Sequence, residues 1–153
     1  MHTENAIVIN APLHVVFQLA ANVEEWPHIL PHYRYVRRRE TFLSRGGVSG
    51  AVFSMCATRS GYPARWTSVQ EPDPSTNRIL YFHIHGVTAG MTVVWTLQDL
   101  EGDTIATIDH DLDPSGWLRN PLASHIVGTE FVMNIADRTL QGIKTRAEST
   151  LCP

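Results

Sequence analysis

Residues 7–33 read IVINAPLHVVFQLAANVEEWPHILPHY, and this stretch decides the fold. It overlaps a short apolar run at 6–10, which predicts a strand. Pro12 then stands near the first position of a helix, where its missing N–H leaves no hydrogen bond unmade. One side of that helix is apolar and consists of Val15, Val16, Leu19 and Ala20. The first helix therefore follows the first strand directly.

A second, shorter helical piece follows after a break. Asn22 is a residue type that caps helix N-termini, and the turn that it would cap begins at 23–26. Pro27 and Pro31 then bracket a compact turn. The sequence predicts two short helical pieces here and not one long helix.

From Tyr33 onward the sequence changes to strands separated by turns. Six strands are predicted in succession, at 33–42, 48–57, 62–71, 78–85, 91–100 and 104–113. The turns between them contain Gly, Pro, Asp or Ser, the residue types that favour tight turns. After Pro121 the pattern becomes helical to about Glu148, with one apolar face. That face consists of Phe131, Ile135, Leu140, Ile143 and Ala147.

This order of elements predicts an α+β fold and one domain spanning residues 1–153. Consecutive strands joined by short turns form an antiparallel meander. The long C-terminal helix must bury its apolar face, and the concave side of a curved seven-stranded sheet offers the surface. A sheet wrapped around a helix in this way leaves an apolar cavity where a ligand binds. A chain of 153 residues buries enough surface to hold such a core without disulfides or metals.

Composition limits the class of protein. Apolar residues make up 43% of the chain and charged residues 18%, which argues against a disordered polypeptide. A formal charge of −3 and a pI near 6.2 argue against a nucleic-acid binder. Cys56 and Cys152 are too few for a disulfide scaffold, so free thiols are expected. No apolar run approaches the roughly 18–20 residues of a membrane helix, and no secretory signal is visible. A soluble, cytoplasmic protein is expected.

Five segments together resemble one known family. They are IVINAPLHVVF (7–17), ANVEEWPHILPHY (21–33), RWTSVQEPD (65–73), MTVVWT (91–96) and DHDLD (109–113). They are similar to the aromatase/cyclase proteins of bacterial type II polyketide synthases, within the START-like, or SRPBCC, superfamily. The resemblance implies the helix-grip fold: a seven-stranded antiparallel curved sheet around a long C-terminal helix, with two short helices after the first strand and an internal apolar cavity.

The resemblance also implies a function. The family templates a linear poly-β-ketone carried on an acyl carrier protein, and promotes an intramolecular aldol condensation followed by dehydration to an aromatic ring. Because the substrate has many reactive methylenes, the main task is to hold one carbon against one carbonyl, and orientation lowers the barrier by several kcal/mol. Proton transfer then needs an acid or base and a donor to the oxyanion. No metal or organic cofactor is expected.

Trp26 matches the tryptophan of the family's W-P motif, and Tyr33 matches a tyrosine at the mouth of the family's cavity. Tyr33 would donate to a ketone or enolate oxygen, and the alternative is an aromatic lid that packs the short helices on the sheet. The alternation of residues puts Trp66, Ser68 and Gln70 on one strand face, which the resemblance turns into the cavity.

Two arginines of the family are replaced in this sequence. The positions that align with them are Gln70 and Phe82. A glutamine donates a hydrogen bond but, being neutral, stabilises an enolate less than a guanidinium does. Gln70 is retained as a candidate catalytic residue and Phe82 as a candidate substrate contact.

His110 is the candidate that takes over this chemistry. On the strand 104–113 it alternates with apolar residues, so it is expected to point into the cavity as a general acid or base near neutral pH. A hydrogen-bonded core histidine is the alternative. The opposite side of this strand, with Asp109, Asp111 and Asp113, is expected to face solvent.

His83 and His85 are expected to share one face of their strand. His83 is a candidate substrate contact. The alternative is a metal site formed by this pair and a carboxylate, but no metal is expected, because two alternating histidines are common by chance.

Further substrate contacts follow from strand alternation and from the resemblance. They are Tyr35, Met91, Val93, Trp95, Phe131 and Asn134. The run Arg37–Arg39 is expected on a charged edge strand that resists edge pairing, or on a surface that receives an acidic carrier protein. Arg119 is a candidate to close the mouth of the cavity.

The function predicted from these residues is a polyketide aromatase/cyclase acting on a carrier-bound poly-β-ketone. Its candidate catalytic residues are Tyr33, His110 and Gln70. The alternative is a binding or transport module for a lipid, quinone or polyketide, which the missing arginines favour. An isomerase or dehydratase acting on a smaller ketone would use the same cavity. The expected partner is a carrier-bound polyketide or another hydrophobic small molecule, with no nucleic acid and no membrane insertion, and the chain is expected to be a monomer or homodimer.

Overall fold

Seven strands form one antiparallel sheet in residues 1–112 and 128–151, the parts that the computed structural model describes. The order across the sheet is β1-β7-β6-β5-β4-β3-β2. The strands are β1 (His2–Ile9), β2 (Tyr33–Leu43), β3 (Ser49–Arg59), β4 (Tyr62–Asp73), β5 (Arg78–Gly86), β6 (Met91–Leu100) and β7 (Asp103–Leu112). The described helices are α1 (Leu13–Ala21), the 3-10 turn η1 (Val23–Glu25), α2 (Trp26–Ile29) and α5 (Thr129–Ser149).

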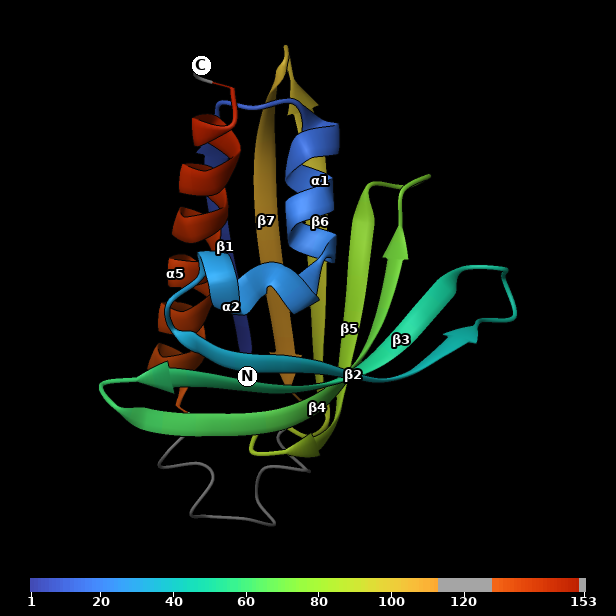
Figure 1. Cartoon of the computed structure of the whole chain (residues 1–153), viewed down its shortest axis with the longest axis vertical. Helices are drawn as coiled ribbons and strands as arrows, with labels where there is room; N and C mark the ends of the chain where they lie inside the picture. The colour runs from blue at the N-terminus through green and yellow to red at the C-terminus, as the bar shows by residue number, and fades with distance from the viewer. Residues whose placement is uncertain (113–127, 152–153) are drawn as a thin grey trace.

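The sheet is strongly curved (Figure 1). Strands β1, β7 and β6 run along the long axis of the molecule, whereas β2 and β4 pass almost at right angles across its lower part. Helix α5 lies beside β1, and α1 lies in front of β6 and β7. The predicted fold class is confirmed: a curved seven-stranded antiparallel sheet, two short helical pieces after the first strand, and a long helix near the C-terminus.

Strand β1 begins earlier than the apolar run at 6–10 predicts. It pairs with β7 from His2 opposite Asp111 to Ile9 opposite Thr104. Its first residues are mostly polar, so a search for apolar runs does not detect this part of the strand. The helix predicted after Pro121 is described from Thr129 onward; residues 121–127 lie outside the described part, as does Arg119.

Side-chain alternation in the central strands builds one wall of the core. Every second residue of β7 is buried, from Thr104 to Leu112, and this includes His110 as predicted. Helix α5 builds the opposite wall with a buried face that consists of Val132, Ile135, Ala136, Thr139, Leu140, Ile143 and Ala147. Among the helices that the structure describes, none combines the length and apolar character that a membrane crossing requires.

An irregularity in β5 overturns the expectation that His83 and His85 share a face. Thr67 pairs with His85 and the next residue, Ser68, pairs with His83, so Ile84 has no partner on β4. His83 is consequently buried and His85 is exposed. Gly86 follows at φ +98°, and a Cβ there would lie 2.2 Å from the carbonyl oxygen of Arg65, so this bend requires glycine.

Candidate functional site

A cavity lies between helix α5 and the concave face of the sheet. Its volume is about 70 Å³, on a measure in which one water needs roughly 10–15 Å³. Apolar side chains supply most of its wall, among them Met91 and Val93 as predicted. The cavity is therefore an apolar pocket with a small number of polar groups, the usual composition of a small-molecule site.

Aromatic rings form one side of this cavity. The ring centroids of Trp26 and Tyr33 are 5.0 Å apart, and those of Trp26 and Trp95 are 6.0 Å apart. Tyr33 also meets the ring of Trp66 edge-on at 6.2 Å. Phe131, at the start of α5, lines the cavity as well. Tyr33 contacts Trp26 and Trp66 edge-to-face and Trp95 packs against Trp26 at a tilt, so these four rings hold one another in place on this side of the cavity.

Tyr33 stands at the first residue of β2, where the chain leaves α2. It is 7% exposed and lines the cavity. Burial raises the pKa of its hydroxyl well above the ordinary value of 10, which the nearby Thr139 hydroxyl partly offsets. Tyr33 is therefore protonated across the physiological range and can donate a hydrogen bond to a ligand oxygen.

His110 enters the cavity from β7. Burial, and secondarily the charge of His2, lowers the pKa of His110 to about 4. The imidazole is thus neutral near pH 7 and can accept a proton but not supply one. Its Nδ1 atom is buried and has no hydrogen-bond partner within the described residues, and the same holds for Nε1 of the cavity-lining Trp66. A polar atom left in this way is costly, so a ligand oxygen or a water reaching either atom would be stabilised.

His83 lies beside Trp66 and is already engaged. Its ring stacks on the Trp66 ring at 5.6 Å, and its Nδ1 is 2.6 Å from the hydroxyl of Thr88. Burial is the main cause that lowers the pKa of His83 to about 3, and the charge of His110 is the second. Within the described residues no group of three or more His, Cys, Asp or Glu side chains could hold a metal ion.

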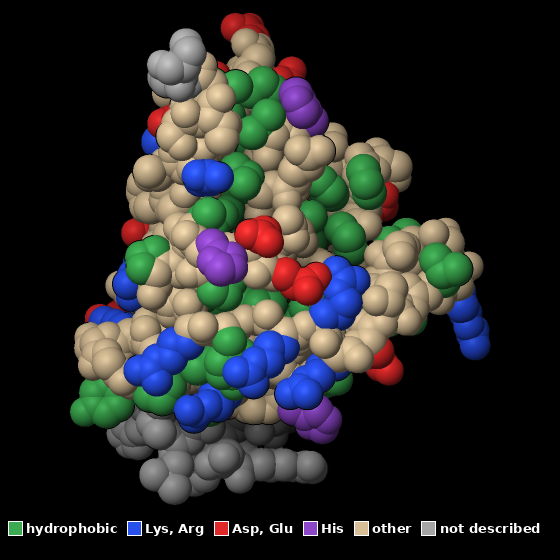
Figure 2. Space-filling view, in the orientation of Figure 1, with side chains coloured by type: hydrophobic (Ala, Val, Ile, Leu, Met, Phe, Trp, Pro, Cys, Tyr) green, Lys and Arg blue, Asp and Glu red, His purple; other side chains and the backbone are tan. Residues whose placement is uncertain are grey.

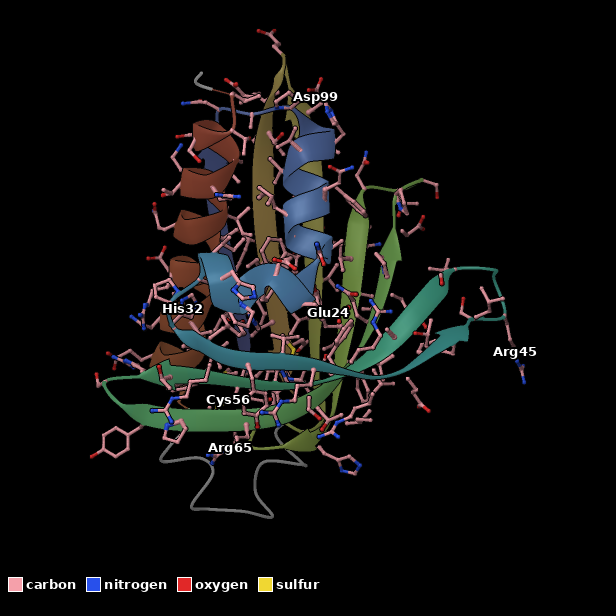
Figure 3. All side chains as sticks on the ribbon, in the orientation of Figure 1. Glu24, His32, Arg45, Cys56, Arg65 and Asp99 are labelled. Carbon is pink, nitrogen blue, oxygen red and sulfur yellow. The ribbon has the colours of Figure 1, made fainter. Side chains whose placement is uncertain are left out.

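His32 and Thr139 form a second polar pair at the cavity wall. The Nε2 atom of His32 lies 3.0 Å from the hydroxyl of Thr139, which donates in turn to the carbonyl oxygen of Ile135. Burial, followed by the charge of Arg138, lowers the pKa of His32 to about 4. Figure 3 shows His32 at the α2–β2 junction, close to α5. The pair ties the connection between α2 and β2 to α5, and the His32 ring centroid is 4.8 Å from that of Tyr33.

Gln70 does not line the cavity. Its Nε2 donates to the carbonyl oxygen of Ala21 at 2.8 Å and to the hydroxyl of Tyr81 at 3.0 Å. Tyr81 donates to the carbonyl oxygen of Ala20. Gln70 therefore satisfies the last carbonyls of α1, and both of its amide hydrogens are used. Ser68 is also fully buried outside the lining, with its hydroxyl 3.4 Å from the carbonyl oxygen of Val69.

Three other predicted substrate contacts lie outside the lining. Phe82 is 45% exposed, because inward and outward residues alternate along β5 and His83 takes the inward place. Tyr35 is turned away by a register shift between it and Tyr33. Asn134 is half-buried on α5, next to the lining residue Ile135.

Comparison with known proteins agrees with this geometry. The family described as polyketide cyclase / dehydrase and lipid transport matches residues 9–136. The chain belongs to this family. A granaticin polyketide synthase bifunctional cyclase/dehydratase from Streptomyces virginiae is 32% identical over 117 residues, which cover 73% of this chain and 36% of that protein. The chain thus spans about a third of the length of this curated relative.

Solved structures of low sequence identity share the fold. The Zhui aromatase/cyclase from Streptomyces sp. R1128 has a TM-score of 0.76 at 20% identity, over 99% of this chain and 95% of that one. A START superfamily protein from Mycobacterium smegmatis has a TM-score of 0.71 at 12% identity, over 97% and 98% of the two chains. The fold is therefore START-like, as the sequence predicts.

Several lining residues of this family member were not predicted from the sequence as site residues. They are Met55, Tyr81, Thr88, Val132, Ala136 and Thr139. Tyr81 lies two residues before His83, so strand alternation alone would have found it. Thr88 lies in the turn between β5 and β6, and no pattern indicates where a turn residue points.

The arrangement of Gln70 predicts a structural effect of its substitution. In Gln70→Ala, the carbonyl oxygen of Ala21 and the hydroxyl of Tyr81 lose a buried partner, so we expect the free energy of unfolding to fall by about 1–3 kcal/mol. Urea unfolding followed by circular dichroism measures this. Gln98→Ala, at an exposed residue of β6, is the control and should change the free energy by less than about 0.5 kcal/mol. If Gln70→Ala were as stable as the wild type, the structural role of the Gln70 side chain would be contradicted.

Three buried histidines predict a loss of stability in acid. The pKa values of His32, His83 and His110 lie at about 4, 3 and 4, below the ordinary 6.5. Between pH 4 and pH 6.5 these histidines bind more protons in the unfolded chain than in the folded protein. The free energy of unfolding is therefore highest above pH 6.5 and falls as the pH decreases toward 4. We expect the midpoint urea concentration to fall through this window, and less steeply in His110→Asn. A midpoint that is constant from pH 7 to 4.5 would refute this.

Proposed function

We propose that this protein is a polyketide aromatase/cyclase that promotes regiospecific intramolecular aldol cyclisation and dehydration of a carrier-bound poly-β-ketone. One observation carries the proposal. The cavity has an aromatic wall, and burial fixes the protonation states of two polar side chains that line it. Tyr33 keeps its proton and His110 lacks one near pH 7. A donor and an acceptor thus line the same apolar cavity.

Templating is the first contribution. The cavity is lined mainly by apolar side chains from the sheet and from α5. It can therefore enclose the segment of the chain that is closing. Enclosing that segment between the aromatic rings and α5 brings one methylene carbon against one carbonyl. This orientation removes much of the entropic cost of reaching the transition state.

Proton transfer is the second contribution. The neutral His110 accepts a proton from the methylene between two ketones, and the resulting enolate carbon bonds to the carbonyl carbon of a third ketone further along the same chain. The imidazolium returns its proton to the new alkoxide oxygen. Removal of a further α-proton and departure of the hydroxyl as water then give the double bond. The enolate opposite the imidazolium raises the pKa of His110 during the step, because opposite charges favour the charged form.

Neutral donors must stabilise the enolate oxygen. No Lys or Arg occurs among the described residues that line the cavity. The hydroxyl of Tyr33 and the unpartnered N–H of Trp66 are the available donors. Donors held in a water-poor cavity are stronger than in solution, so they take over part of what the family's arginines would supply at Gln70 and Phe82.

Reconstitution tests the proposal. A minimal polyketide synthase with its loaded carrier protein is incubated with and without this protein, and products are identified by mass spectrometry. A shift from spontaneously cyclised products to one defined aromatic product supports the cyclase and gives the ring position. An unchanged mixture, with protein shown to be folded, overturns it.

The second candidate is a binding or transport module for a hydrophobic ligand. It is favoured by the absence of cationic side chains among the described lining residues, because a neutral apolar cavity retains a ligand without activating it. Native mass spectrometry of the purified protein distinguishes the two candidates. A stoichiometric lipid or quinone that remains bound, together with unchanged products in the reconstitution, favours the binding module.

A further inference from the structure

Charge is distributed very unevenly along this chain. Residues 34–65 contain seven arginines and one acidic residue, Glu40, whereas the rest of the chain contains five basic and fourteen acidic residues. The segment therefore carries a net charge of +6 within a protein of net charge −3. This segment forms most of β2, all of β3 and the start of β4. The small net charge of the whole chain is thus the sum of one strongly basic segment and an acidic remainder.

The sheet register gathers part of this charge on the convex face, opposite the cavity. Met55 and Trp66 pair with each other and line the cavity. The next pair, Cys56 with Arg65, therefore points outward. Tyr35 pairs with Cys56 and Arg37 pairs with Ser54 on the same outer side.

Contacts among these side chains hold the outer arginines in place. The guanidinium of Arg37 lies 4.3 Å from the centroid of the Tyr35 ring, and Nε of Arg39 donates to the hydroxyl of Ser54 at 2.7 Å. We name the outer surface formed by Arg37, Arg39 and Arg65, with Tyr35 and Ser54, the basic face. Figure 2 shows Lys and Arg side chains gathered over β2 and the neighbouring strands in the lower part of the molecule.

The arginines of the basic face are not neutralised within the described residues. Arg38 pairs with Glu24 at 2.6 Å and Arg59 with Glu130 at 2.7 Å. No carboxylate of residues 1–112 or 128–151 lies within 4.0 Å of the guanidinium nitrogens of Arg37, Arg39 or Arg65, and all three residues are exposed. Like charges on a rigid sheet repel one another, so an acidic partner would gain electrostatic energy at this surface.

Strand β4 connects the basic face with the cavity wall. Trp66, which follows Arg65 in β4, lines the cavity from the inner side of the sheet. The backbone N–H of Val87 donates to the carbonyl oxygen of Arg65 at 3.2 Å, and the next residue, Thr88, lines the cavity. The basic face and the cavity wall are thus opposite sides of the same strand.

We propose that the basic face docks an acidic carrier protein. This inference rests on the proposed function, since it names the surface that receives the carrier of the same substrate. Carboxylates on the carrier would pair with Arg37, Arg39 and Arg65, and the phosphate of its prosthetic arm would suit a guanidinium geometrically.

Binding to the carrier without any polyketide tests the docking separately from the chemistry. A fluorescently labelled holo-acyl carrier protein from a type II synthase is titrated with the whole protein at 50 and 200 mM salt, and anisotropy gives Kd. In the double variant Arg37→Glu/Arg65→Glu we expect Kd to rise at least 10-fold at the lower salt. We expect the wild type to weaken with salt and the double variant to show little salt dependence.

Arg45→Glu is the matched control. It makes the same charge change within the same segment, but Arg45 lies in the β2–β3 turn and projects away from the sheet (Figure 3). Its Kd should stay within threefold of the wild type. The variant Arg37→Lys/Arg65→Lys keeps the charge and should recover most of the affinity.

Defined outcomes overturn the docking proposal. These are no measurable carrier binding by the wild type, an unchanged Kd in the double variant, or an equal effect of Arg45→Glu. Binding to vesicles of phosphatidylglycerol in place of the carrier would assign the basic face to an anionic membrane. If ring formation persists in reconstitution while carrier binding is unaffected by the double variant, the docking site is wrong and the proposed function stands. If carrier binding follows the prediction but no ring forms, the docking site stands and the proposed function is wrong.

Discussion

On the proposed function, we expect His110→Ala to slow formation of the defined aromatic product by about 10²- to 10⁴-fold, the range that a positioned acid or base contributes. The reason is that His110 is neutral, with a pKa near 4, in a cavity where no other described lining residue but the engaged His83 is an imidazole. Product formation from a loaded carrier protein under single-turnover conditions, followed by mass spectrometry, measures the effect.

Two further substitutions separate chemistry from packing. His110→Asn retains a polar atom near the position of Nδ1 but cannot carry the proton, so it should be nearly as slow as His110→Ala. His14→Ala, at an exposed histidine of α1, should leave the rate unchanged. If His110→Asn were as fast as the wild type, His110 would serve only to shape or solvate the cavity.

Leu140→Ala lowers the free energy of unfolding by about 2–5 kcal/mol, the usual cost of truncating a fully buried leucine. Leu140 is 1% exposed on the face of α5 that closes the core. Because domains of this size are stable by about 5–15 kcal/mol, the loss is a large fraction of the total. Urea unfolding monitored by tryptophan fluorescence measures it.

The control for Leu140 is on the same helix. Met133 is 41% exposed, and Met133→Ala should change the free energy of unfolding by less than about 0.5 kcal/mol. Similar losses in both variants would contradict the assignment of Leu140 to the core and of Met133 to the surface of α5. A small loss at Leu140 alone would mean that the core closes around the truncated side chain.

The cavity wall was predictable where strands are regular. Along β6 and β7, inward and outward residues alternate without interruption, so Val93, Trp95 and His110 were placed correctly. Prediction failed where a register shift intervenes. Such a shift turns Tyr35 away from Tyr33, and another separates His83 from His85. A bulge depends on the pairing of two strands, and neither strand shows it on its own.

The order of elements, the curved antiparallel sheet with its long helix, and the apolar character of the cavity wall are predictable from local patterns: alternation, helical periodicity and turn residues. The family is predictable from the resemblance of five sequence segments to known proteins. The tertiary structure alone decided which polar groups are free. The amide of Gln70 donates to the carbonyl oxygen of Ala21 at the end of α1, whereas Nδ1 of His110 has no hydrogen-bond partner among the described residues. The reason is that hydrogen-bond satisfaction and pKa depend on residues that are distant in the chain and meet only when the sheet closes around α5.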